Sequence, residues 1–199
     1  MELQPHTNPW RILLASAQAA NAVSHMPFAQ LATVAAGTQG HETRPNVRTV
    51  ATRFFLDDGR LLISTDARND KAQDLAEHPL CELCWYFTAT REQFRLSARA
   101  QLITAPQARL EAKLDAVLMQ TWQQRSDTSR HSFSWPQPKR KRADTSAFEL
   151  PTPLDPPDHF ALLLLDIYAV DYLSLAQAPH TRRVFSKLGG QWLAREVNP

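Results

Sequence analysis

The sequence predicts a mainly β protein of the α+β class, built as an antiparallel barrel with helices beside it. Short runs rich in β-branched and aromatic residues recur along the chain, separated by turn residues, which is typical of barrels and sandwiches. Hairpin signals such as Asp57-Asp58-Gly59 join neighbouring runs, and tight turns of this kind connect antiparallel strands. The chain has 5 glycines and no G-x-G-x-x-G or G-x-x-x-x-G-K-[ST] pattern. The parallel-sheet nucleotide folds that use these loops are therefore excluded.

Three helices are expected among the strands. Asn8 can cap a helix and Pro9 suits its first turn, and an Ala- and Leu-rich stretch follows them. Asn69 is a second capping residue, and Pro79 ends the helix that it starts. Pro106 begins a third helix with leucines at heptad-like spacing. The predicted helices cover residues 10–23, 106–124 and the part of the segment 66–79 that follows Asn69.

Several runs are candidate strands, and we expect six or seven antiparallel strands in total. The last long run needs a kinked or bulged middle, and Gly189-Gly190 predicts a closing hairpin. The proline-rich segment 125–158 is irregular, so it is expected to be an ordered lid or a mobile loop. The candidate strands cover residues 28–36, 47–56, 60–65, 80–87, 92–103, 160–175, 184–188 and 192–197.

Charge and hydropathy argue against two classes of binding partner, nucleic acids and membranes. The chain carries 22 Lys and Arg against 20 Asp and Glu, a net charge of +2, which disfavours a dedicated nucleic-acid binder. Its longest apolar run, over residues 160–165, is far shorter than the roughly 20 residues of a membrane span. The N-terminus lacks a basic flank followed by an apolar core. We therefore expect a cytoplasmic protein with no nucleic-acid or membrane partner.

The cysteine pair, the basic run and the histidines could indicate redox, nucleic-acid or metal chemistry, but we interpret most of these residues as structural. Cys81-Glu82-Leu83-Cys84 has C-x-x-C spacing but lies in a predicted strand, where residues three apart face opposite sides. Neither redox chemistry nor a zinc site is expected there. The basic run Lys139-Arg140-Lys141-Arg142 is expected to be solvated. Among the 7 histidines only His180 is kept as a site candidate, and no metal site is predicted.

Polar and basic side chains gather at the end of the central hairpin and at the start of the helix after it. A strand end, a helix N-terminus and cations together are typical of a phosphate site, because free N–H groups and the helix dipole favour an anion there. Arginine supplies a planar fork for phosphate oxygens, and lysine supplies a point charge. The alternative is a set of exposed charges at a sheet edge. The group comprises Arg48, Arg53, Ser64, Thr65, Arg68, Asn69 and Lys71.

The same residues carry a family resemblance. The matching segments are Arg48-Thr49-Val50-Ala51-Thr52-Arg53, Leu62-Ile63-Ser64-Thr65-Asp66, Asn69-Asp70-Lys71, His78-Pro79, Gln93 and, near the C-terminus, Arg182, Phe185, Trp192 and Val197-Asn198-Pro199. The spacings between them fit without insertions. In these motifs the sequence resembles the pyridoxamine 5'-phosphate oxidase-like FMN-binding split barrels, over nearly the whole chain.

The resemblance implies a fold, an assembly and a cofactor. The expected fold is a six-stranded antiparallel split barrel with flanking helices, forming a single FMN-binding domain over residues 1–199. Two copies are expected to form a homodimer with FMN at the interface, contacted by both subunits. The flavin would supply the reactive chemistry, and the protein would bind, orient and tune it.

The resemblance also implies roles for particular residues. Arg48 and Lys71 would bind the FMN phosphate, and Val50 and Ala51 would approach the flavin ring through their backbone. The implied cofactor-binding residues are Arg48, Thr49, Val50, Ala51, Arg53, Ser64, Thr65, Arg68, Asn69, Lys71, Gln93 and Arg182. The implied substrate-binding residues are Arg53, Arg130 and His180. No catalytic residue is named.

Four departures from the family pattern affect these expectations, and one is that Arg53 stands where the family has a substrate-facing lysine. Asp70 replaces the arginine of the family's phosphate-binding Arg-Lys pair, and an Asp repels a phosphate, so we expect Arg68 to compensate. The family's segment for the substrate phosphate has no clear match, although Arg125 and Arg130 are of the right residue type. The arginine of the C-terminal R-x-H signature is replaced by Ala178. FMN binding is therefore better supported than pyridoxamine phosphate oxidation.

Three functions follow from these observations. The first is an FMN-dependent oxidoreductase that transfers a hydride or electrons on an unidentified small-molecule substrate. The second is pyridoxamine 5'-phosphate oxidase activity itself. The third is a flavin- or haem-binding protein without turnover, because one fold can host both enzymes and binding proteins.

Overall fold

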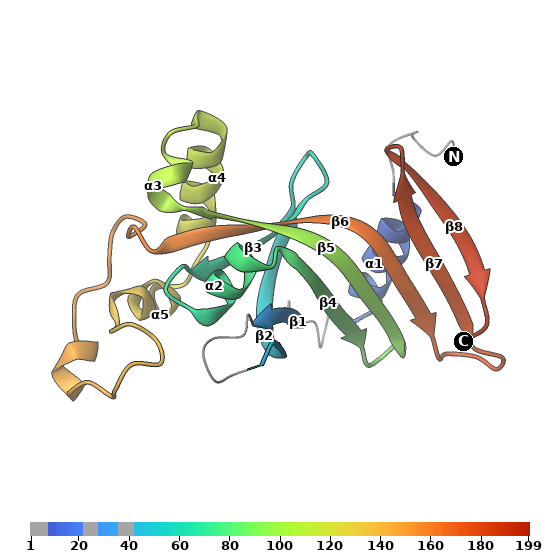
Figure 1. The fold of residues 1–199 in the computed structure, drawn as a ribbon, viewed down its shortest axis with the longest axis horizontal. Coiled ribbons are helices and arrows are strands. Elements are labelled where there is room, and N and C mark those ends of the chain that lie inside the picture. Colours follow the sequence, from blue (N-terminus) through green and yellow to red (C-terminus); the bar gives the residue numbers. More distant parts are fainter. Residues whose placement is uncertain (1–7, 22–27, 36–41) are drawn as a thin grey trace.

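Eight antiparallel strands form one curled sheet in the computed structural model, which describes residues 8–21, 28–35 and 42–199. The strands are β1 (Phe28–Ala35), β2 (Arg44–Phe55), β3 (Leu61–Asp66), β4 (Leu80–Phe87), β5 (Glu92–Thr104), β6 (Phe160–Ser174), β7 (Thr181–Leu188) and β8 (Gln191–Val197). Their order is β3-β2-β1-β4-β5-β6-β7-β8, and β3 also pairs with β6. That pairing closes six strands into a barrel, from which β7 and β8 extend (Figure 1). The predicted six-stranded antiparallel barrel is confirmed, with two further strands joined to it.

Within the described residues, five α-helices and two short 3-10 helices flank this sheet. They are α1 (Pro9–Ala20), α2 (Asp70–Glu77), α3 (Ala105–Ala108), α4 (Ala112–Gln123), α5 (Asp127–His131), η1 (Ser132–Ser134) and η2 (Thr145–Phe148). α1 begins where Asn8 and Pro9 predict it, and part of its predicted end, residues 22 and 23, lies outside the described residues.

One predicted helix start is confirmed and one predicted helix needs correction. The helix expected within 66–79 begins at Asp70, directly after the predicted cap Asn69, and the Asp66 carboxylate accepts the backbone N–H of Arg68 at 2.8 Å in the turn before it. The single helix expected over 106–124 is broken into α3 and α4. Leu110, at the break, is 89% exposed. Arg109 beside it donates to the carbonyl oxygen of Pro156 at 2.7 Å.

Strand β6 is buried on both faces, which explains its long apolar run. Residues facing the barrel interior, such as Leu163 and Leu165, belong to the core that includes Trp10 of α1. The alternate residues, such as Phe160 and Leu164, belong to a second core beneath α3 and α4. The register between β5 and β6 shifts between Ile167 and Ala169, so the bulge predicted in the middle of this strand is confirmed.

The β7–β8 hairpin turns at the predicted place. Gly189 and Gly190 have φ values of +56° and +83°, and two successive positive φ angles are what a two-residue hairpin turn requires. A residue with a side chain would be strained at either position. The hairpin forms the end of the molecule opposite to α5 (Figure 1).

The segment over 125–158 packs against the barrel, although little of it is regular. Phe133 is buried in the second core. Trp122 donates its indole N–H to the carbonyl oxygen of Leu154 at 2.9 Å, and the ring of His159 lies 2.8 Å from the carbonyl oxygen of Phe133. Arg125 and Lys139 of the segment contact Ser64 of β3 and Asp70 of α2. No helix among the described ranges is long and apolar enough to cross a membrane.

The second core gives a test of the fold. Phe160 is 0% exposed and lies edge-to-face with Trp122 and Phe133, at centroid distances of 5.0 and 5.1 Å. We expect Phe160→Ala to lower the free energy of unfolding by about 3–5 kcal/mol. The exposed control Leu110→Ala should change it by less than about 0.5 kcal/mol. Equal effects of the two substitutions in urea unfolding would contradict this placement of β6.

Candidate functional site

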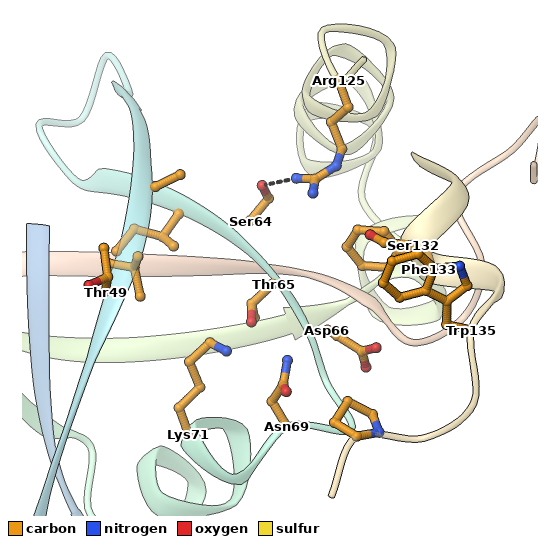
Figure 2. A pocket seen from close by; sticks show the side chains of 14 residues that line it. Thr49, Ser64, Thr65, Asp66, Asn69, Lys71, Arg125, Ser132, Phe133 and Trp135 are labelled. Carbon is orange, nitrogen blue, oxygen red and sulfur yellow. Dashed lines mark hydrogen bonds between the residues drawn. The ribbon is translucent and has the colours of Figure 1, made fainter. Parts of the chain in front are cut away.

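A pocket of about 350 Å³ lies where β2, β3, the start of α2 and the segment after α4 meet (Figure 2). β3 contributes Ser64, Thr65 and Asp66, the polar second half of a strand whose apolar first half is buried in the core. The lining residues are Thr49, Val50, Ala51, Ile63, Ser64, Thr65, Asp66, Asn69, Lys71, Arg125, Ser132, Phe133, Trp135 and Pro138. Four of the seven residues of the predicted anion site, Ser64, Thr65, Asn69 and Lys71, therefore line this one pocket.

Ser64 joins two arginines at one end of this pocket. Its hydroxyl oxygen accepts a hydrogen bond from Arg53 Nε at 3.2 Å and another from Arg125 Nη1 at 2.7 Å. The Arg125 guanidinium also lies over the ring of Phe133, 4.8 Å from its centroid. Sequence reasoning named Arg125 only as a residue of a suitable type, because its approach to Ser64 depends on the packing of a segment 61 residues away.

Neither of these arginines has a carboxylate partner among the described residues. The Nε atom of Arg125 is buried and has no hydrogen-bond partner. Burial and the charge of Arg53 lower the pKa of Arg125 to about 10, and burial lowers the pKa of Arg53. Two neighbouring cations without a counter-ion are unfavourable unless a ligand supplies negative charge. This end of the pocket is suited to an anionic group.

Lys71 brings a third cation to the opposite end of the pocket, across Thr65 from Arg125 (Figure 2). Its ammonium group makes no hydrogen bond or ion pair with any other described residue. Burial lowers the pKa of Lys71 and the charge of Arg48 lowers it further, while the charges of Asp66 and Asp70 offset part of this effect. Asn69 stands at the N-cap position of α2 as predicted, but its side chain does not cap the helix. It lines the pocket instead.

Arg48 lies in an adjoining hollow of about 320 Å³, which shares Asn69 and Lys71 with the pocket. The Arg48 guanidinium donates to Thr33 Oγ1 at 2.6 Å and to the Asp74 carboxylate at 3.2 Å. Although burial alone would raise the pKa of Asp74, hydrogen bonds from Thr33 and Asn46 and the charge of Arg48 lower it overall. Asp74 therefore stays ionised and fixes the position of Arg48. Sequence reasoning missed Asp74, whose only signal was its place one turn after Asp70.

The compensation expected for Asp70 comes from a different residue. Arg68 is bound to the Asp66 carboxylate through Nε and Nη2 at 3.0 and 2.7 Å, and it also donates to the carbonyl oxygen of Trp135. It is therefore not free to neutralise Asp70. Asp70 pairs instead with Lys139, from the basic run that was expected to be only solvated.

Seven predicted site residues do not line this pocket. Arg48, Arg53 and Arg68 lie beside it, with the contacts given above, and the other four make their contacts elsewhere. Gln93 lies on β5, opposite Tyr86 and Leu173. Arg182 lies on β7, and its guanidinium is bound to the Asp171 carboxylate at 2.6 Å. The other two are Arg130, which pairs with Asp127, and His180, whose ring lies 2.8 Å from the carbonyl oxygen of Gln177. Their proposed roles remain predictions.

Known proteins share both the sequence and the fold of this chain. The family model "Pyridoxamine 5'-phosphate oxidase, FMN-binding domain" matches residues 7–104. The Arabidopsis thaliana protein "Pyridoxine/pyridoxamine 5'-phosphate oxidase 2" is 34% identical over 207 residues, which cover 98% of both chains. The chain belongs to the pyridoxamine 5'-phosphate oxidase family. Its resemblance to FMN-binding split barrels is therefore confirmed.

Two solved structures extend the comparison within this fold. A pyridoxamine 5'-phosphate oxidase-related, FMN-binding protein from Nostoc punctiforme is 35% identical, with a TM-score of 0.86 and 100% coverage of both chains. PhzG from Burkholderia lata, solved with tetrahydrophenazine-1-carboxylic acid, has a TM-score of 0.74 at 19% identity and covers 98% of this chain and 95% of its own. The second similarity concerns the fold alone.

The residues of the pocket fit the family's cofactor, FMN. A phosphate needs cations and free donors, and Lys71, Arg48 and the N-terminus of α2 lie together at one end. A flavin ring needs an apolar wall with backbone polar groups, and residues 49–51 of β2 supply such a wall. Arg53, Ser64 and Arg125 lie together at the other end of the pocket.

The two cysteines behave as the sequence predicts for strand residues. Cys81 is buried and Cys84 is half-buried, and both are free thiols. Burial raises the pKa of Cys81 to about 12, and burial together with the charge of Glu82 raises the pKa of Cys84. A raised pKa leaves a thiol protonated and unreactive at neutral pH.

This placement predicts low thiol reactivity. At pH 8 we expect Cys81 of the native protein not to react with a disulfide reagent, since its thiol is almost entirely protonated, whereas the urea-unfolded chain should react at both cysteines. Mass spectrometry of the labelled protein would check this. Rapid labelling of native Cys81 would contradict its buried position.

Proposed function

We propose that this protein is an FMN-dependent oxidoreductase that acts on a small anionic substrate. The observation behind the proposal is a set of cations that form no ion pair with a described carboxylate: Lys71 at one end of the pocket and Arg125 at the other, with Arg53 beside Arg125 on Ser64. Such a set is costly in a protein without ligands and favourable when anions bind.

The two ends would serve two anionic groups. Arg48 and Lys71 would hold the cofactor phosphate, with Asp74 fixing Arg48 in place. FMN, when bound, would supply hydride or electron transfer. Arg53 and Arg125 would hold an anionic group of the substrate, and Ser64 would keep both guanidinium groups oriented toward it. Phe133, which is buried beside Arg125, would keep water from that end.

We extend the proposal to a homodimer with FMN at the interface. Gln93 and Arg182, which the family resemblance implies as flavin contacts, do not line this chain's own pocket, so a second copy would supply them. Exposed apolar side chains on the strands support such a contact. Val47 is 65% exposed and Leu80 is 49% exposed, and apolar groups of this kind are common in interfaces.

A second candidate is the oxidation of pyridoxamine or pyridoxine 5'-phosphate, the activity in the name of the Arabidopsis thaliana relative. The paired arginines at Ser64 favour it, because a guanidinium fork suits a substrate phosphate. Ala178 disfavours it, since the family's signature has an arginine there. The production of pyridoxal 5'-phosphate in an oxygen-dependent assay would distinguish this activity from the oxidation of another anionic substrate.

The cofactor assignment can be tested at the phosphate end. The double variant Arg48→Ala with Lys71→Ala should bind FMN much more weakly, because charge-assisted contacts contribute about 1.5–3 kcal/mol each. Fluorescence titration would measure the dissociation constant. Arg60→Ala is a matched control, because Arg60 binds Asp58 in the distant β2–β3 turn. Unchanged FMN affinity in the double variant would overturn the site assignment.

The substrate side can be tested with a pair of amines. Arg125→Met should raise the KM for pyridoxamine 5'-phosphate more than the KM for pyridoxamine, since only the first carries an anion for Arg125 to hold. The dissociation constant of FMN should stay unchanged. A steady-state assay of hydrogen peroxide production would give both KM values. Equal changes for the two amines would show that Arg125 has only a structural role.

A further inference from the structure

Asp70 places a negative charge beside the proposed cofactor-phosphate site. It is the first residue of α2 and lines the same hollow as Arg48 and Lys71. Its side chain is 43% exposed, so water moderates its charge but does not remove it. A phosphate in this hollow would be repelled by Asp70 unless another cation neutralised that carboxylate.

Lys139 is that cation, and it comes from a segment 69 residues away. Its ammonium group pairs with the Asp70 carboxylate, and its side chain lines the hollow beside Arg48 and Lys71. The hollow is therefore lined by three cationic side chains and one acidic side chain. Without Lys139, only Arg48 and Lys71 would remain in the hollow to offset the negative charges of Asp70 and a phosphate.

The backbone of Lys139 has an uncommon conformation. Lys139 has a φ of +60°, which is uncommon for a residue with a side chain and persists where the surroundings determine it. The preceding Pro138 lines the main pocket, and the carbonyl oxygen of Trp135 accepts a hydrogen bond from Arg68 at 3.2 Å. Residues 125–142, which we call the strap, are thus attached to β3 at Ser64 and to the start of α2 at Asp70.

We propose that Lys139 is a binding residue for the FMN phosphate, supplied by the strap, and that it helps the protein to select FMN over the unphosphorylated flavin, riboflavin. The inference rests on the proposed FMN site and adds a residue that the family pattern does not include. Lys139 neutralises Asp70 and adds its own attraction to a phosphate. Because the strap also contains Arg125, one segment contacts both ends of the pocket.

The experiment compares two flavins that differ only in the phosphate. Fluorescence titration would give the dissociation constants of FMN and riboflavin for the wild-type protein and for Lys139→Ala. The variant should bind FMN about three- to tenfold more weakly, the range between an exposed ion pair and a charge-assisted contact. Its affinity for riboflavin should stay unchanged. The loss for FMN should diminish at high salt, because Lys139 is 75% exposed.

Two further variants make the test specific. Asp70→Asn should tighten FMN binding, and in that background Lys139→Ala should have a smaller effect, because there is no longer a carboxylate to neutralise. Lys141→Ala, in the same basic run, is the matched control and should leave both constants unchanged. The variants should also have the wild-type melting temperature of unliganded protein, which excludes a general effect on folding.

The outcomes separate the two proposals. Unchanged FMN affinity in Lys139→Ala, or equal losses for FMN and riboflavin, would overturn the role of Lys139 and leave the FMN site standing. A wild-type protein that binds neither flavin would overturn the proposed function, and the role of Lys139 with it. A loss confined to FMN and reduced in the Asp70→Asn background would support the proposal.

Discussion

The pairing of β3 with β6 is the interaction on which the rest of the structure depends. It closes the barrel and sets Ser64 and Thr65 opposite Leu162 and Ala161. Since β6 begins at Phe160, the segment before it must return across the end of β3, where Phe133 packs on Phe160. One strand pairing therefore places the polar end of β3 and the wall of the pocket side by side.

The charges of the pocket follow a clear division. Arg48 and Arg68 are each paired with a carboxylate, from Asp74 and Asp66, and so have a fixed position. Lys71, Arg53 and Arg125 have no such partner among the described residues, and burial weakens their protonated forms. Pairing with a carboxylate fixes the position of Arg48 and Arg68, while Lys71, Arg53 and Arg125 have no described carboxylate to fix them. This arrangement is suited to a cofactor phosphate and an anionic substrate.

The sequence predicted the strands well because their signals are local. Alternation of side chains, hairpin turns and Gly189-Gly190 each depend on neighbouring residues. The start of α2 was predicted from the cap Asn69, whereas the break at Leu110 was missed, because Arg109 makes a contact that a helical pattern does not reveal. The site residues on β2, β3 and α2 could be predicted because they belong to short, local sequence motifs. The contributions of Arg125 and Lys139 depend on how a segment without periodicity packs.

The measurement that tests this account most directly is the visible absorption spectrum of the full chain, taken after incubation with FMN and desalting. The account predicts a retained flavin spectrum that bleaches on reduction and returns in air, since the pocket offers both a phosphate site and a wall for the ring. A protein that emerges colourless, or one that instead retains haem from a parallel incubation, would contradict it. The cations of the pocket would then need another anion to explain them.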